Sequence, residues 1–118
     1  EQVRSWFIGV LRDNAGVPLH MMGSEVPLEF GQKKFRADIV IYDRALKPLA
    51  VVECKRPEVE LSEEVVLQAL RYNAVLDVAF VFLTNGKNTY LYARKGDKAS
   101  FEALSSLPKY EEMLLCRQ

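Results

Sequence analysis

The segments Arg36-Ala-Asp-Ile-Val-Ile-Tyr42 and Leu49-Ala-Val-Val-Glu-Cys-Lys55 are two apolar runs of strand length, and each contains an acidic residue. Asp38 lies near the beginning of the first run, whereas Glu53 and Lys55 end the second. Residues two apart on a strand project from the same face, so Glu53 and Lys55 are expected to lie side by side. Charged side chains in such apolar surroundings need a partner or a function.

The loop Asp43-Arg-Ala-Leu-Lys47 between these runs fits a hairpin, so the runs are predicted to be neighbouring antiparallel strands. Asp38 and Glu53 can then lie on adjacent strands roughly 5 Å apart, close enough to share one cation. Two carboxylates and a lysine are the minimum set for metal-dependent phosphodiester hydrolysis, because the acids hold a hard cation and the ammonium acts on the attacking water. A surface ion pair at a strand end is the plainer interpretation.

The chain has 118 residues, 49% of them hydrophobic, which suits one domain over residues 1–118. The longest apolar runs, such as residues 78–83, are far shorter than the roughly 18 residues that cross a bilayer. No signal-peptide pattern opens the chain, so a soluble, cytoplasmic protein without a membrane partner is expected. Because Glu1 lies inside an expected helix and no initiator methionine is present, we expect further residues before it.

The sixteen basic and sixteen acidic residues cancel, which argues against nucleic-acid binding through bulk charge. Any such affinity should come from a local patch at the ends of the predicted elements, with Lys33, Lys34, Arg36, Lys55, Arg56, Arg71, Lys87 and Arg94 as candidates. A solvated scatter of charges explains these residues equally well. Cys54 and Cys116 lack the spacing of a disulfide framework or a zinc site and are expected to be free thiols.

Apolar residues at helical spacing predict a first helix that ends near Gly16 and carries Val3, Trp6, Phe7, Val10 and Leu11. A second helix is predicted from a cap at Ser62 to about Leu76, with acidic residues in its first turn, where the helix dipole favours them. Short helical pieces are expected at residues 101–104 and 109–115.

Three further strands are predicted. Residues 25–30 alternate, and Pro27 favours a short edge strand there. Residues 78–83 are a continuous apolar run that suits a buried strand parallel to a neighbour. Residues 89–94 follow an Asn-Gly turn and close a hairpin, and Gly96-Asp97 marks another turn. The order α-β-β-β-α-β-β predicts an α/β fold with a mixed sheet of about five strands flanked by helices.

Four segments of the chain together resemble a known family, namely Arg36-Ala-Asp-Ile-Val40, Glu53-Cys-Lys55, Gln68-Ala-Leu-Arg-Tyr72 and Leu83-Thr-Asn-Gly86. Their order is similar to that of the PD-(D/E)xK nuclease superfamily, and most closely to the N-terminal nuclease domain of type I restriction enzyme R subunits. The resemblance spans nearly the whole chain, although Ala37 replaces the usual proline before the first aspartate. It implies a restriction-endonuclease-like fold and divalent-metal-dependent endonuclease activity on DNA phosphodiester bonds.

By this resemblance, Asp38, Glu53 and Lys55 would be the catalytic residues. Asp38, Glu53 and the backbone carbonyl of Cys54 would ligate Mg²⁺ or Mn²⁺, and Lys55 would orient or deprotonate the attacking water. The side chain of Cys54 is expected to point to the opposite face and join the core. The basic candidates for DNA binding would be Lys33, Lys34, Arg36, Arg56 and Arg71.

Gln68 and Tyr72 lie four residues apart and therefore share one helix face, which the resemblance places at the border of the catalytic site. A half-buried packing face explains them equally well. Glu1 is a candidate for the acid that related nucleases carry near the start of their first helix, with Glu25 and Glu29 as weaker candidates. A solvated glutamate in a first helical turn is the alternative for Glu1.

The resemblance also implies DNA as a partner and a larger restriction or repair complex, with an oligomer as a further option. A function of a different class is a noncatalytic nucleic-acid-binding or assembly module that keeps the nuclease fold. The neutral net charge favours that alternative. A third alternative gives the acidic residues a role in stability alone.

Overall fold

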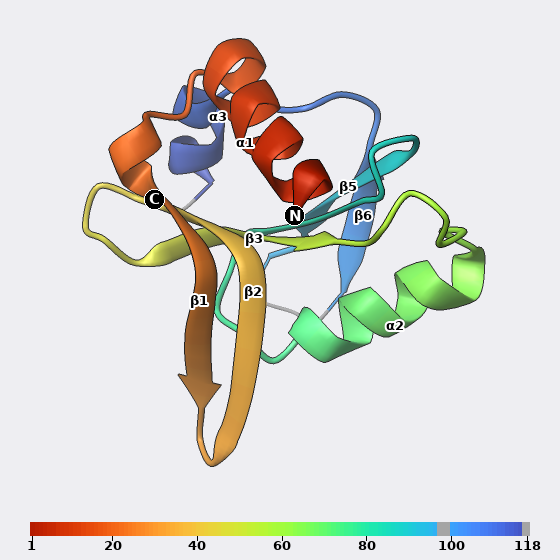
Figure 1. The fold of residues 1–118 in the computed structure, drawn as a ribbon. Helices are drawn as coiled ribbons and strands as arrows, with labels where there is room; N and C mark the ends of the chain where they lie inside the picture. The colour runs from red at the N-terminus through yellow and green to blue at the C-terminus, as the bar shows by residue number, and fades with distance from the viewer. Residues whose placement is uncertain (97–99, 117–118) are drawn as a thin grey trace.

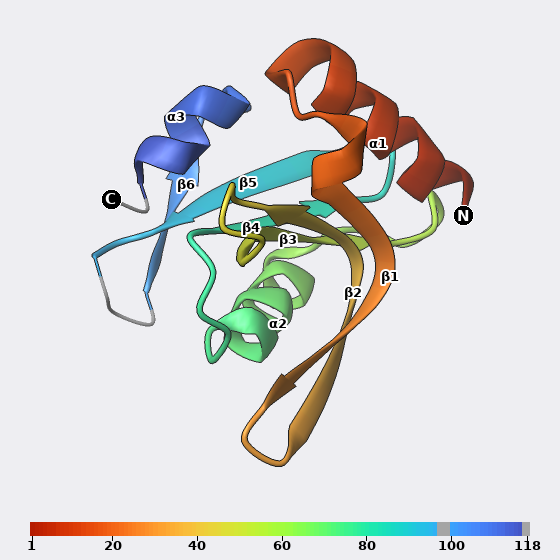
Figure 2. The same cartoon turned by 90° about the vertical axis from the view of Figure 1, so that its left-hand side faces the viewer.

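The computed structural model describes residues 1–96 and 100–116. Within these ranges a single mixed sheet contains six strands in the spatial order β1-β2-β3-β4-β5-β6, with helices on both of its faces (Figure 1, Figure 2). The strands are β1 (Met22–Phe30), β2 (Lys33–Tyr42), β3 (Pro48–Cys54), β4 (Phe80–Thr84), β5 (Thr89–Arg94) and β6 (Phe101–Leu104). The helices are α1 (Gln2–Ala15), α2 (Glu63–Asn73), α3 (Tyr110–Leu115) and the short 3-10 helix η1 (Leu19–Met21).

The pairing of the central strands confirms the predicted mixed α/β sheet. β2 and β3 are antiparallel, with Ile39 opposite Val52, and β4 lies parallel to β3 after the crossover through α2. β1 lies at the edge, as Pro27 indicated, although it begins at Met22 and is longer than predicted. A turn was predicted at Gly96-Asp97. Gly96 has a φ of 62°, and Asp97 lies outside the described residues.

The helix predicted at residues 101–104 is wrong, because these residues form the edge strand β6 and bring the sheet to six strands instead of about five. β6 pairs antiparallel with β5, with Phe101 opposite Arg94. The Arg94 guanidinium lies 4.9 Å from the centroid of the Phe101 ring, an arrangement typical of cation–π contacts. The open edge of β5 therefore outweighs the weak helical preference of this short segment.

Helices α1 and α3 cover one face of the sheet (Figure 2). Phe7 and Leu11 repeat at helical spacing along the buried side of α1, and they pack on Ile39, Val52 and Phe82 of the sheet. As predicted, α1 ends near Gly16, which has a φ of 71° and donates its N–H to the carbonyl of Leu11. These contacts fix α1 across β2 and β3.

Helix α2 covers the opposite face (Figure 2). The predicted cap is confirmed, because the Ser62 hydroxyl accepts a hydrogen bond from the Val65 N–H at 3.3 Å. The helix ends at Asn73 instead of about Leu76. The carbonyls that follow it are bound by the Arg94 guanidinium, which donates to Leu76 at 2.6 Å and Val78 at 2.7 Å. Arg94 therefore holds the segment between α2 and β4, whereas the charge pattern had suggested a place in a basic patch.

The long β1–β2 hairpin curls toward the α2 side of the sheet (Figure 1, Figure 2). Ile39 packs in the core under α1, whereas Phe35 and Ala37 belong to the core under α2, although strict alternation would place all three on one face. The change of face occurs at Asp38, opposite the point where Glu25 of β1 has a φ of 54°. In the described ranges, no helix is long and apolar enough to span a bilayer.

Candidate metal and nucleic-acid site

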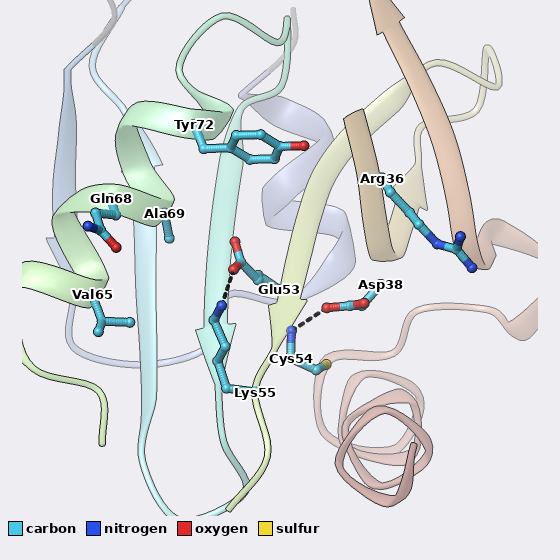
Figure 3. A pocket seen from close by; sticks show the side chains of 9 residues that line it. All are labelled: Arg36, Asp38, Glu53, Cys54, Lys55, Val65, Gln68, Ala69 and Tyr72. Carbon is cyan, nitrogen blue, oxygen red and sulfur yellow. Dashed lines mark hydrogen bonds and ion pairs between the residues drawn. The ribbon is translucent and has the colours of Figure 1, made fainter. Parts of the chain in front are cut away.

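A cavity of about 500 Å³ lies between α2, the middle of β2 and the end of β3 (Figure 3). It brings together all three of the predicted catalytic residues and the predicted pair on α2. The lining residues are Arg36, Asp38, Glu53, Cys54, Lys55, Val65, Gln68, Ala69 and Tyr72. Sheet geometry therefore gathers side chains from three separate elements into one pocket.

Asp38 is held against β3 by a backbone hydrogen bond. Its Oδ2 accepts a bond of 2.6 Å from the Cys54 N–H (Figure 3). A carboxylate that accepts a backbone N–H is well fixed, because the charge-assisted bond is stronger than a neutral one. The acid on β2 is thus positioned directly beside the segment that carries Glu53 and Lys55.

Glu53 and Lys55 form the ion pair expected from their spacing, with 2.9 Å between Lys55 Nζ and Glu53 Oε2 (Figure 3). Their side chains are 28% and 36% exposed, so solvent screens the pair and its net contribution to stability is at most about 1 kcal/mol. The ion pair that the plainer interpretation placed at this strand end is therefore present. Both residues nevertheless line the same cavity as Asp38.

The donor set at this cavity fits a hard divalent cation. Asp38 and Glu53 line it and carry carboxylate oxygens, a ligand type that Mg²⁺ and Mn²⁺ prefer. Within the described ranges, no cluster of three or more His, Cys, Asp or Glu side chains is suited to a metal. A cation here would depend on two carboxylates, completed by carbonyl, water and phosphate oxygens, which suits Mg²⁺.

The side chain of Cys54 packs against the core under α1, on the face opposite the cavity's acids, as predicted. Burial, followed by the charge of Asp38, raises the pKa of its thiol to about 12. Cys54 and Cys116 are both free, which confirms the absence of a disulfide between them.

Gln68 and Tyr72 both face the cavity from α2 (Figure 3). The Tyr72 ring meets the buried Phe35 ring edge-on, with 4.8 Å between the centroids, and the residue is still 48% exposed. Tyr72 is therefore both a packing residue and part of an open cavity wall. The packing interpretation of this helix face is confirmed for Tyr72, and its role at a catalytic site stays a prediction.

Glu1 does not line this cavity. It pairs with Arg4 of α1 and lines a neighbouring hollow of about 400 Å³, which shares Cys54 and Lys55 with the cavity and also contains Arg56. Glu25 accepts hydrogen bonds from both Arg4 and Arg36. The bond from Arg4, followed by the one from Arg36, lowers the pKa of Glu25. The sequence pattern gave no signal for this network, because its members are separated along the chain.

Of the remaining basic candidates, Lys33, Lys34 and Arg71 line a third hollow together with Phe35, Tyr72 and Val75. Lys87 is exposed in the turn between β4 and β5, and it does not line the cavity or either neighbouring hollow. The structure therefore divides the predicted basic patch among several locations instead of placing it in one cleft.

The Leu83-Thr-Asn-Gly86 segment anchors the chain that leaves β3. The backbone N–H of Lys55 donates to the Thr84 carbonyl at 2.8 Å. Asn85 is only 3% exposed and donates from Nδ2 to the Val59 carbonyl at 2.7 Å. Sequence reasoning identified an Asn-Gly turn here but missed this anchoring role, which involves a residue distant along the chain.

Comparisons with known proteins agree with this architecture. A family model described as the type I restriction enzyme R protein N terminus matches residues 1–108. The type I restriction enzyme EcoAI endonuclease subunit of Escherichia coli is 46% identical over 50 residues, which cover 42% of this chain and 6% of that protein.

Two solved structures share the fold. A fragment of a candidate HsdR subunit of a type I restriction enzyme from Vibrio vulnificus has a TM-score of 0.62 at 20% identity, covering 93% of this chain and 24% of the other. A candidate nuclease of the DUF820 group from Anabaena variabilis has a TM-score of 0.55 at 13% identity, covering 88% of this chain and 65% of the other. The predicted fold class is thereby confirmed. The chain spans less than two thirds of each of these relatives.

Proposed function

Because the chain belongs to the family of type I restriction enzyme R protein N termini, we propose that it is a nuclease domain that hydrolyses DNA phosphodiester bonds with the help of a divalent cation. The observation that carries this proposal is the single cavity lined by Asp38, Glu53 and Lys55 beneath α2. The nuclease-like fold of the chain supports the same conclusion.

In this proposal, Asp38, Glu53 and the carbonyl of Cys54 hold Mg²⁺ or Mn²⁺. When bound, the cation supplies positive charge that stabilises the phosphate oxygens and favours ionisation of water. Asp38 needs little rearrangement, because the Cys54 N–H already fixes one of its oxygens and leaves the other for a ligand. Its role is to present a negatively charged oxygen at a defined place in the cavity.

Lys55 is the proposed residue that acts on the attacking water. Lys55 follows Glu53 by two residues, and its ammonium pairs with the Glu53 carboxylate. It therefore lies beside a proposed cation ligand and lines the same cavity. From this position it can donate a hydrogen bond that orients the water, or accept its proton after losing its own. Gln68 and Tyr72 close the opposite wall and would limit where the DNA backbone enters.

The alternative function is a noncatalytic DNA-binding or assembly module. The Glu53–Lys55 ion pair favours it, because one of only two acidic side chains in the cavity already has a partner. The chain spans a small part of its restriction-enzyme relatives, so we propose that DNA delivery and assembly involve a larger restriction complex.

The test is incubation of the purified protein with plasmid DNA and Mg²⁺ or Mn²⁺. The wild type and the control Lys87→Ala, which alters an exposed lysine outside the cavity, should convert supercoiled plasmid to nicked or linear forms. Asp38→Ala and Lys55→Ala should each lose activity by roughly 100-fold or more. Activity that survives both substitutions would remove these residues from the reaction. An inert wild type that gives no heat with Mn²⁺ would favour the noncatalytic module.

A further inference from the structure

A hollow of about 330 Å³ lies between the turn end of the β1–β2 hairpin and the last turn of α2. β2 contributes Lys33, Lys34 and Phe35, α2 contributes Arg71 and Tyr72, and the turn after α2 contributes Val75. The three cations come from two elements that are far apart along the chain. The fold brings them together around an apolar floor formed by Phe35 and Val75.

The charge of this hollow is uncompensated. No acidic side chain is among its lining residues, and among the ion pairs of residues 1–96 and 100–116 none involves Lys33, Lys34 or Arg71. Glu29 lies opposite Lys34 in the strand register but lines a different hollow. In a chain whose net charge is zero, three such cations form a distinct local site for an anion.

The other basic candidates are in different surroundings. Arg36 is bound by Glu25, and Arg56 lies in the hollow that also contains Glu1 and Glu58. Lys55 is paired with Glu53. Among these basic candidates in the described part of the chain, Lys33, Lys34 and Arg71 therefore share a hollow whose lining contains no acidic residue.

This basic hollow lies next to the proposed catalytic cavity, because Tyr72 lines both. The packing of its ring on Phe35 holds Tyr72 in place between them. An extended polyanion that enters the cavity at Asp38 and Glu53 can therefore pass Tyr72 and reach the three cations. A single small anion would have no need for this second compartment.

We infer that the hollow formed by Lys33, Lys34 and Arg71 binds backbone phosphates of the DNA strand that flank the bond to be cut. This inference rests on the proposal that DNA is the substrate, and it adds the path that the strand takes. Each phosphate that a cation neutralises releases counterions, so the logarithm of the affinity falls with the logarithm of salt concentration by about 0.7 per contact on a single strand. Three contacts should contribute about 2 to this slope.

The test compares Lys33→Gln/Lys34→Gln/Arg71→Gln with a control of equal charge change, Lys47→Gln/Lys87→Gln/Lys95→Gln, whose residues are exposed and lie outside the hollow. Binding of a short fluorescent single-stranded oligonucleotide is measured by anisotropy over a range of NaCl concentrations in EDTA. Thermal melting checks that each variant is folded. The first variant should have a salt slope that is shallower by about 2, whereas the control should keep the wild-type slope.

Equal slopes for the wild type and the hollow variant, or an equal loss in the control, would overturn the inference. Should the triple variant fail to fold, Lys34→Gln and Arg71→Gln alone should each reduce the slope by about 0.7. Because EDTA excludes hydrolysis, the two proposals can fail separately. If the hollow variant has a shallower salt slope but the wild type never cuts plasmid, only the nuclease proposal is refuted. If the wild type cuts plasmid but the hollow variant keeps the wild-type salt slope, only the proposed strand path is refuted.

Discussion

The carboxylate of Asp38 accepts a 2.6 Å hydrogen bond from the backbone N–H of Cys54, the residue between Glu53 and Lys55. The last regular pair of β2 and β3 toward this end is Ile39 with Val52, so the side chain of Asp38 continues the connection where the ladder stops. Asp38 therefore has a structural role as well as its proposed role as a ligand. The two roles can be separated by substitution.

Asp38→Ala and Asp38→Asn should differ in stability and agree in metal binding. Alanine leaves the Cys54 N–H without its acceptor, which should lower the free energy of unfolding by about 1 to 3 kcal/mol, whereas asparagine keeps an acceptor oxygen and should cost less. Both remove the charge, so both should abolish the heat of Mn²⁺ binding in calorimetric titration. Urea denaturation measures the stability difference. Wild-type Mn²⁺ affinity in Asp38→Asn would show that this residue is not a ligand.

Lys55→Gln should reduce hydrolysis without reducing metal binding. The substitution releases Glu53 from its ion pair, so Mn²⁺ affinity should be unchanged or higher, while plasmid cleavage falls by roughly 100-fold or more. Because the pair is partly exposed, the free energy of unfolding should change by less than about 1 kcal/mol. Lys55→Arg is the informative companion, since arginine keeps the charge but does not release a proton. It should restore the ion pair without restoring cleavage if Lys55 transfers a proton.

Asn85→Ala should destabilise the segment that follows Lys55. The Asn85 side chain is buried, donates to the Val59 carbonyl, and accepts from the N–H groups of Lys87 and Asn88 at 2.9 and 2.8 Å. At about 1 kcal/mol for each net hydrogen bond, the loss should be about 3 kcal/mol in urea denaturation.

A matched variant separates the two parts of this anchor. Asn85→Asp keeps the oxygens that accept from the turn but cannot donate to Val59, so it should lose part of the stability. Hydrogen exchange should then increase at residues 56–61 before it increases in β4. An unchanged free energy of unfolding in Asn85→Ala would contradict the anchoring role.

The convergence of Asp38, Glu53 and Lys55 could be predicted because it depends on local rules. A short loop fixes the antiparallel neighbour, and the two-residue period of a strand fixes the face. The partners of Arg36 could not be predicted in this way. Glu25 has a φ of 54°, and its side chain meets Arg4 of a distant helix as well as Arg36. No pattern within β1 indicates that backbone conformation.

The edge strand β6 was missed for a different reason. Phe101-Glu-Ala-Leu104 is short and contains good helix formers, so its local preference is weak and points away from a strand. The strand forms because its backbone pairs with the edge of β5 and because the Arg94 guanidinium contacts the Phe101 ring. Both influences come from tertiary structure. The helical period of α1 and the continuous apolar run of β4 were predictable because burial and local preference agree in both.

Glu25 should make the stability of the protein depend on pH in the acidic range. Hydrogen bonds from Arg4, and then from Arg36, lower the pKa of Glu25 in the folded state. The unfolded chain therefore binds more protons at this residue as the pH falls below the ordinary carboxyl value of 4.5, and the stabilising contribution is lost progressively there. Above that value the contribution is fully present.

Glu25→Gln is the test, because it removes the charge and keeps the size of the side chain at a position with positive φ. The free energy of unfolding of the wild type should exceed that of Glu25→Gln at neutral pH, and the difference should shrink as the pH falls below about 4.5. Glu29→Gln, on the same strand and without an ion pair among the described residues, is the control and should lack this pH-dependent difference. Added salt should also reduce the effect of Glu25→Gln, because the network is partly exposed. A difference that stays constant from neutral to acidic pH would mean that the contacts of Glu25 contribute through packing and not through its charge.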